Sequence, residues 1–139
     1  MVPSPIRLTI PVDLWQAMLD HIRSCAPDEA CGLAIGRLRM VTEIHPIENQ
    51  ARSPVRFRMD PEAQVRELLD LEARGMSLLA IYHSHPAGAP LPSPTDLAEW
   101  QYPEALSLIW GCDDGQWQAR AYDLSGPRPV EAALDVAPD

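Results

Sequence analysis

The chain contains no lysine, and its 11 basic residues are all arginine. Against them stand 20 acidic residues, which leave a net charge of -9 at pH 7. A surface with this excess of negative charge repels phosphate backbones and anionic lipid headgroups. The charge balance therefore disfavours a general nucleic-acid-binding protein or a protein of the membrane surface.

Cysteine is scarce and long apolar runs are missing. The three cysteines, Cys25, Cys31 and Cys112, form no C-x-x-C pair, which disfavours both a disulfide framework and a cysteine-rich zinc site. No apolar run approaches the ~20 residues that a membrane-spanning helix needs. Residues 1–5 lack the basic start and the apolar core of a signal peptide. We therefore expect a cytoplasmic protein with reduced thiols.

The remaining composition is that of one globular domain. The chain has 139 residues, of which 46% are apolar and 22% charged, so it is long enough for one hydrophobic core and too short for two ordinary domains. We expect the domain to span residues 1–124. An acidic, proline-bearing tail, residues 125–139, follows it, and the sequence assigns no structure to this tail.

Apolar patterns predict helices and strands that are intermixed along the chain. Leu14, Met18 and Ile22 recur at helical spacing, and Asp60-Pro61 is a favourable helix start. This mixture predicts an α/β or α+β domain in which helices cover a sheet of about six strands. Helices are expected at residues 12–25, 61–74 and 94–101, and strands at residues 6–10, 33–35, 40–47, 56–58, 78–82, 105–110 and 117–122.

The segment from His83 to Asp96 holds the residues most suited to chemistry. On a strand, His83 and His85 point to the same face, because side chains alternate with a period of two. Two imidazoles at the end of a strand suit a divalent metal such as zinc, and Asp96 is a candidate third ligand. Three protein ligands would leave a fourth position open for water, as in catalytic zinc sites.

A simpler interpretation of the same segment involves no chemistry. Ser93-Pro94-Thr95-Asp96 is also a favourable helix start, with Ser93 as the cap and Asp96 as its acidic partner three residues later. An H-x-H pair alone also arises by chance on protein surfaces. From the residues alone, metal binding and helix capping both remain open.

The whole pattern, H-x-H-x7-S-x2-D, resembles the metal-binding motif of the JAMM (JAB/MPN+) metalloproteases. Glu29, in Glu-Ala-Cys-Gly, stands where this family has an upstream glutamate. Similarity continues through Asn49, the Arg56-Phe57-Arg58 segment, Asp60-Pro61 and Tyr102-Pro103, and so covers about residues 6–122. The short length and the Glu-x-Cys-Gly context are most similar to the small prokaryotic branch of the family.

The resemblance implies a fold, a cofactor and a set of roles. It implies an α/β MPN (JAB-like) domain with a mixed sheet flanked by helices. His83, His85 and Asp96 would hold one zinc ion per chain, and Glu29 would act as the general base. Ser93 would donate a hydrogen bond to the oxyanion of the tetrahedral intermediate.

The resemblance also implies a substrate class. The protein would be a zinc peptidase or isopeptidase that cleaves after the C-terminal Gly-Gly of a ubiquitin-like or sulfur-carrier protein. The alternative is a non-catalytic MPN module that serves as a scaffold in a larger assembly, which the intact ligand set disfavours. The missing lysines would suit an enzyme that works beside a conjugation system, but a general preference for arginine explains them more simply.

Overall fold

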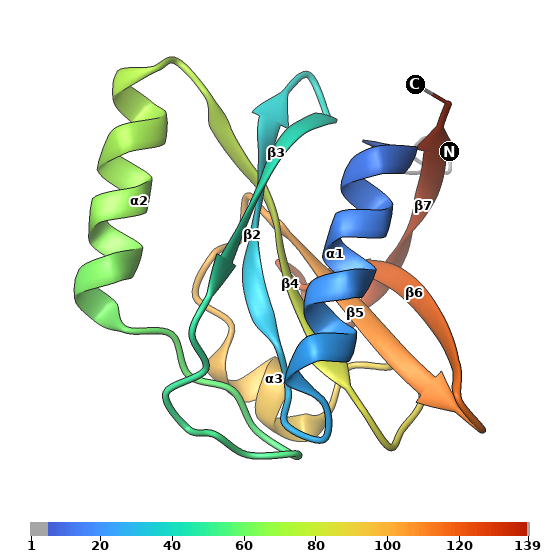
Figure 1. Ribbon diagram of the computed structural model, residues 1–139. Helices are drawn as coiled ribbons and strands as arrows, with labels where there is room; N and C mark the ends of the chain where they lie inside the picture. The colour runs from blue at the N-terminus through green and yellow to red at the C-terminus, as the bar shows by residue number, and fades with distance from the viewer. Residues whose placement is uncertain (1–5, 139) are drawn as a thin grey trace.

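The computed structural model describes residues 6–138, which form seven strands and three helices (Figure 1). None of the helices in this range is both long and apolar enough to cross a membrane. Residues 1–5, on which the expectation about a signal peptide rests, lie outside the described residues. In chain order the elements are β1 (Arg7–Pro11), α1 (Val12–Cys25), β2 (Cys31–Arg37), β3 (Met40–Ile47), α2 (Pro61–Ala73), β4 (Ser77–His85), α3 (Pro94–Glu99), β5 (Leu106–Asp113), β6 (Gln116–Asp123) and β7 (Val130–Ala137).

The strands form one mixed sheet that closes on itself in the order β1-β3-β2-β4-β5-β6-β7. Closure results from β1, which pairs in parallel with both β3 and β7. β4 and β5 are also parallel, whereas the β2–β3, β2–β4, β5–β6 and β6–β7 pairs are antiparallel. The prediction of an α/β domain with a mixed sheet is confirmed, with seven strands where about six were expected.

The seventh strand lies in the segment to which the sequence assigned no structure. β7 pairs with β1 from Arg7 opposite Ala133 to Pro11 opposite Ala137, and with β6 on its other side. Its burial does not alternate, and Ala132 is its one fully buried residue. Residues 130–137 are therefore part of the sheet, although their apolar pattern is too weak to predict a strand.

Two hydrophobic clusters lie on opposite faces of β2 and β4. Ala34 and Ala80 belong to a cluster with Met18 and Ile22 of α1. Their neighbours Leu33 and Ile81 belong to a second cluster, which Leu71 of α2 completes. Because successive strand residues face opposite sides, α1 and α2 cover the two faces of the sheet (Figure 1). The prediction that residues 78–82 form a doubly covered strand is confirmed.

The helix starts also follow from the sequence. α1 has the predicted bounds, and the side chain of Asp60 accepts a hydrogen bond from the N–H of Glu62 at the start of α2. After α2, the chain turns at Gly75, whose φ of 69° lies in the left-handed region that glycine adopts readily.

The strand predicted at Arg56–Arg58 is wrong. These residues have no regular secondary structure and form no ladder with another strand of the described chain. The Asn49 side chain instead hydrogen-bonds the carbonyl of Arg56 and the N–H of Arg58. The backbone groups that point to one edge of this segment are thereby satisfied locally.

Candidate metal centre

The candidate site lies where β4 ends beside the start of β2. His83 and His85 are the third-last and last residues of β4, and His83 pairs with Cys31 at the first position of β2. The pairing continues one step further, because Ala30 N donates to Ser84 Oγ (2.8 Å) and Ser84 N donates to Ala30 O (3.1 Å). This antiparallel register places Glu29 next to the two histidines.

Asp96 reaches the histidines from the first turn of α3. The Ser93 hydroxyl accepts a hydrogen bond from Asp96 N (3.0 Å), and the Asp96 carboxylate accepts one from Ser93 N (2.8 Å). This reciprocal pair is a capping box, as the simpler interpretation of the sequence predicts. The cap does not remove Asp96 from the site, because the capping oxygen, Oδ2, also faces both imidazoles.

The proline-rich loop between β4 and α3 lies against β5 and β6. Cys112 N donates to Gly88 O (2.9 Å), and the Tyr122 hydroxyl donates to Pro90 O (3.0 Å). At Gly111, an added Cβ would lie 2.4 Å from the backbone nitrogen of Pro90, so only glycine permits this approach. The loop therefore brings α3, and with it Asp96, to a fixed place beside β4.

Three potential ligand atoms meet at one point. His83 Nε2 lies 3.2 Å from His85 Nε2, and Asp96 Oδ2 lies 3.3 Å from each of them. Ligand atoms at roughly 2.0–2.1 Å from a tetrahedral zinc ion lie about 3.3 Å from one another. The three atoms therefore fit one face of a zinc coordination tetrahedron, and the donor set of two imidazoles and a carboxylate suits zinc.

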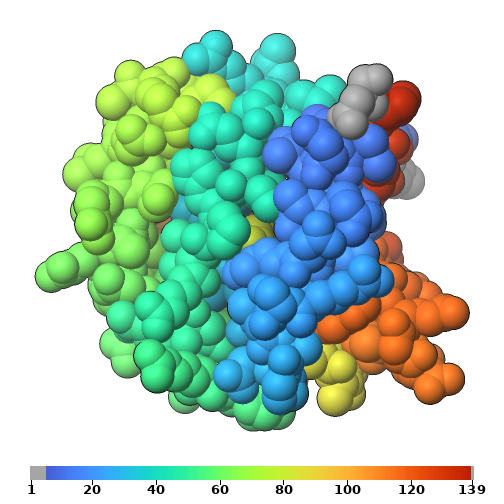
Figure 2. Space-filling view, viewed as in Figure 1, coloured from blue at the N-terminus to red at the C-terminus, as the bar shows by residue number. Residues whose placement is uncertain are grey.

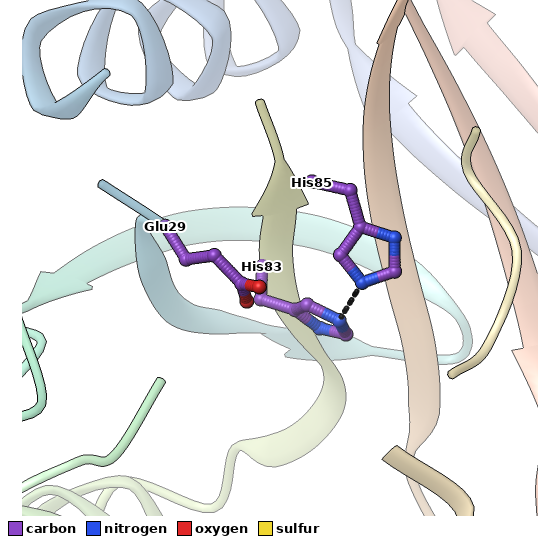
Figure 3. A group of neighbouring side chains, drawn as sticks. All are labelled: Glu29, His83 and His85. Atoms are coloured by element: carbon purple, nitrogen blue, oxygen red, sulfur yellow. Dashed lines mark hydrogen bonds between the residues drawn. The ribbon is translucent and has the colours of Figure 1, made fainter. Parts of the chain in front are cut away.

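Glu29 faces this group from the other side. One donor atom from each of Glu29, His83 and His85 lies within 4.8 Å of the other two, and Figure 3 shows the Glu29 carboxylate directed toward the imidazole of His83. Glu29 is 3% exposed. Within residues 6–138, Glu29 forms no ion pair with a histidine at 4.0 Å or less, whereas Asp96 Oδ2 lies 3.3 Å from both. The geometry therefore favours Asp96 as the third ligand and Glu29 as a neighbouring group.

A hydrogen bond sets the tautomer of His85, and a ring contact orients His83. His85 Nδ1 lies 3.0 Å from the carbonyl oxygen of Ala89, which can only accept, so Nδ1 carries a proton and Nε2 can offer its lone pair. The His83 ring is stacked on Phe57, with centroids 4.6 Å apart. Both contacts orient an imidazole toward the point where the ligand atoms meet.

Burial and neighbouring charges set the protonation of the group. Complete burial lowers the pKa of His83, against the attraction of Asp96, which favours the neutral imidazole that a metal requires. Burial also opposes charge on His85, but the Asp96 carboxylate and the Ala89 carbonyl outweigh it, and the pKa of His85 is raised. Burial disfavours the ionised form of Asp96 too, but its hydrogen bonds to both histidines prevail and hold its pKa far below the ordinary value.

The pKa of Glu29 is shifted in the opposite direction. Burial is the main cause and raises the pKa to about 7; the negative charge of Asp96 adds to this, and His85 opposes it. A carboxylate with a pKa near neutrality can both take up and release a proton at physiological pH. Glu29 is therefore suited to proton transfer.

A pocket of about 490 Å³ opens beside the ligand atoms. Its walls are the segment 55–59, the helix α3, and Trp100 and Tyr102 beyond it. Three buried polar atoms of lining residues, His83 Nδ1, Trp100 Nε1 and Ser107 Oγ, have no hydrogen-bond partner within residues 6–138. Buried polar groups are nearly always partnered, so these atoms are available to a polar ligand or to ordered water.

Residues 11–124 match the family described as prokaryotic homologs of the JAB domain, and the chain belongs to this family. The resemblance stated from the sequence is thereby confirmed. The chain is 42% identical to a probable TtuB-protein conjugate cleaving protease of Thermus thermophilus, with 93% of this chain and 82% of that protein covered. It is 34% identical to a desampylase of Haloferax volcanii, with 93% and 97% covered.

A solved structure supports the same fold. Protein DSY2949 of Desulfitobacterium hafniense superposes with a TM-score of 0.85 at 28% identity, over 95% of this chain and 94% of that one. The family and its fold thus agree with the sheet described above.

The structure brings the sequence-derived candidates together. His83, His85 and Asp96 are in contact, Glu29 faces them, and Ser93 joins them through its N–H bond to Asp96. Their individual roles stay predictions. Sequence reasoning missed Ser84, whose only signal was its place between the two histidines. It noted Asn49 as part of the family resemblance but assigned it no contact; both residues act through backbone contacts.

Proposed function

We propose that the protein is a zinc-dependent peptidase or isopeptidase. It cleaves the bond after the C-terminal Gly-Gly of a ubiquitin-like or sulfur-carrier protein, in the cytoplasm. The observation that carries the proposal is the convergence of His83 Nε2, His85 Nε2 and Asp96 Oδ2 within 3.2–3.3 Å, beside a buried glutamate. The relatives named as a conjugate cleaving protease and a desampylase support the same class of reaction.

His83, His85 and Asp96 would hold the zinc ion. When bound, zinc lowers the pKa of a coordinated water to roughly 7 and polarises a carbonyl group. The protein's own contribution is to present a neutral imidazole at His83 and an ionised carboxylate at Asp96, which the pKa shifts of these two residues favour. The capping box and the Ala89 carbonyl keep two of the ligands oriented.

Glu29 would transfer the proton. Its carboxylate takes a proton from the attacking water as the new C–O bond forms, and then gives it to the leaving nitrogen as the C–N bond breaks. A pKa of about 7 lets one group perform both transfers. The sequence-derived role of Glu29 thus has a physical basis in its burial.

Ser93 can serve the helix and the reaction at once. Its hydroxyl oxygen accepts a hydrogen bond from Asp96 N, which leaves the hydroxyl proton free for another acceptor. Donated to the developing oxyanion, that proton would stabilise the tetrahedral intermediate. Capping and catalysis are therefore compatible roles of one side chain.

The pocket suits a narrow, extended peptide. Asn49 bonds the carbonyl of Arg56 and the N–H of Arg58. Between them, the N–H and C=O of Phe57 form no hydrogen bond within residues 6–138. An extended tail could pair with this free edge, as peptides do when they add a strand to a sheet. Glycine has no side chain to collide with the walls, so a Gly-Gly terminus would reach the ligand atoms most easily.

The test compares two fusions of a ubiquitin-like protein to a reporter, with Gly-Gly or with two bulky residues before the junction. We expect cleavage directly after the second glycine and little cleavage of the bulky version, with Glu29→Gln as the inactive control. Much of the binding energy should come from the folded body, so a short peptide with the same tail should be a poor substrate. Equal rates for the two fusions would indicate a general peptidase and refute the proposed specificity.

A further inference from the structure

Asn49 is the only asparagine of the chain, and its side chain uses its full hydrogen-bonding capacity. Nδ2 donates to the carbonyl oxygens of Glu29 (3.0 Å) and Arg56 (2.9 Å). Oδ1 accepts from the N–H groups of Ala51 (3.0 Å) and Arg58 (2.9 Å). One amide thus joins the backbone of Glu29 to the segment that lines the pocket beside the ligand atoms.

The same loop holds the other backbone group of Glu29. Glu29 N donates to Ser53 O (2.8 Å), so both the N–H and the C=O of Glu29 are bonded to residues 49–53. Figures 1 and 2 show the chain near residue 30, in blue, beside the green segment that follows β3. Without these bonds, Glu29 would lie in a short connection between α1 and β2 that has no ladder of its own.

A second anchor lies on the side of the histidines. Ala30 exchanges two hydrogen bonds with Ser84, which stands between His83 and His85. Glu29 is therefore held between the histidine strand through Ala30 and the pocket wall through Asn49. The Glu29 carboxylate can keep one orientation relative to the histidine strand and to the pocket wall only if the bonds through Ala30 and through Asn49 are intact.

We propose that Asn49 is a positioning residue for the reaction: its amide fixes the backbone of Glu29 relative to the pocket wall at Arg56–Arg58, so that the carboxylate faces the bond of a substrate lying along that wall. The inference rests on the proposed function. Asn49 itself need not touch the substrate, because it acts through Glu29 and through the wall.

An amide is required at this position for a chemical reason. The site calls for two donated and two accepted hydrogen bonds from one short side chain, which only asparagine supplies at this length. Aspartate has the same shape but only accepts when ionised. It could therefore keep the bonds from Ala51 and Arg58, which shape the loop, and would lose the bonds to Glu29 and Arg56.

Asn49→Asp should accordingly remove the hydrogen bond to Glu29 while keeping the bonds that shape the loop. With the Gly-Gly fusion as substrate, we expect kcat to fall about 10- to 100-fold, since a small misplacement of a catalytic group costs this much. KM should change less than kcat, and the zinc content should stay that of the wild type. Val41→Ala is the stability control: it removes buried methyl groups from β3 and should lower the Tm while leaving kcat unchanged.

Amide hydrogen exchange gives a readout that needs no turnover. Asn49→Asp should speed exchange in residues 28–31 more than in β5, whereas Val41→Ala should not single out these residues. An unchanged kcat in Asn49→Asp, or a loss of kcat no larger than that of a control with the same Tm, would overturn the inference. If the wild-type protein does not cleave the fusion, the proposed function fails. In that case the exchange experiment still tests the inference, because unchanged exchange at residues 28–31 in Asn49→Asp would show that Asn49 does not hold the backbone of Glu29.

Discussion

Residues 6–138 contain two clusters of histidine and carboxylate side chains with different geometry. At the end of β4, two imidazoles and Asp96 direct single atoms at one point, with mutual distances of 3.2–3.3 Å. On β3, by contrast, His45 has a separate carboxylate on each ring nitrogen: Nδ1 lies 2.6 Å from Glu67 and Nε2 lies 2.9 Å from Glu43.

Hydrogen bonds alone can satisfy the polar atoms of the His45 cluster, but not those of the cluster at the end of β4. Each His45 nitrogen can donate to its own carboxylate, and Arg74 neutralises Glu43 with two further hydrogen bonds, of 2.6 and 3.1 Å. At the end of β4, two Nε2 atoms share a single carboxylate oxygen, and a bare cation satisfies all three lone pairs at once. Convergence on one point, rather than residue type, therefore distinguishes a metal site from an ion-pair network.

The largest expected effect comes from removing a ligand. His83→Ala or His85→Ala should lose the bound zinc and all measurable cleavage, because two ligands cannot hold the ion tightly. Zinc per chain, measured after dialysis by mass spectrometry, checks this, with His45→Gln as the matched histidine control that should keep its zinc. Unchanged zinc in both ligand variants would contradict the assignment of the site.

Glu29→Gln should keep the metal and lose turnover. The amide has the same shape but cannot take up a proton, and the loss of a general base typically lowers kcat about 100- to 10,000-fold. Parallel measurements of zinc content and kcat check the prediction. Loss of zinc in this variant would show that Glu29 is a ligand, as its distance of less than 4.8 Å from the histidine atoms allows.

Ser93 separates capping from catalysis. Ser93→Ala should fold, bind zinc and lower kcat about 100- to 1,000-fold if the hydroxyl stabilises the oxyanion, while the lost cap costs about 1 kcal/mol. Ser93→Gly is the matched control, because glycine also serves as a helix cap and should restore stability without restoring kcat. Reduced thermal stability with full activity in Ser93→Ala would leave the helix cap as its only role.

The smallest effect belongs to the ion-pair cluster. Burial lowers the pKa of His45, but its bonds to Glu43 and Glu67 outweigh this and raise it above the ordinary value. The resulting stabilisation is complete below about pH 6.5 and is lost as the pH rises through the raised pKa. His45→Gln should thus lower the free energy of unfolding by less than about 1 kcal/mol at pH 6, because the cluster is partly exposed, and hardly change it at pH 9. Thermal unfolding at the two pH values checks this. An equal loss at both pH values would argue against the charged form.

Local patterns predicted much of the fold and of the site. The spacing of Leu14, Met18 and Ile22 defined α1, Asp60 marked the start of α2, and the H-x-H spacing placed two imidazoles on one face of β4. These features depend on periods and caps that lie within a few residues. The contact between His85 and Asp96 also spans a short stretch of chain, which the proline-rich loop bridges.

Features that depend on distant contacts escaped prediction. Val130–Ala137 has no clear alternation and becomes a strand because β1 and β6 offer it two edges. Arg56–Arg58 alternates as a strand would, but Asn49 takes up the Arg56 carbonyl and the Arg58 N–H along one of its edges. The four bonds of Asn49 could not be seen in the sequence, because a backbone carbonyl acquires its partner only when the chain has folded.

The closure of the sheet by β7 has a consequence for how the chain folds. The pairing of Arg7 with Ala133 joins residues that are 126 positions apart, so β1 must wait for β7 to be synthesised before this edge is paired. Contacts of such separation form slowly, because a long loop must close before they contribute. A growing or truncated chain that ends at residue 124 would carry every residue of the candidate metal centre and yet leave β1 and β6 with unpaired edges, which favour association between chains.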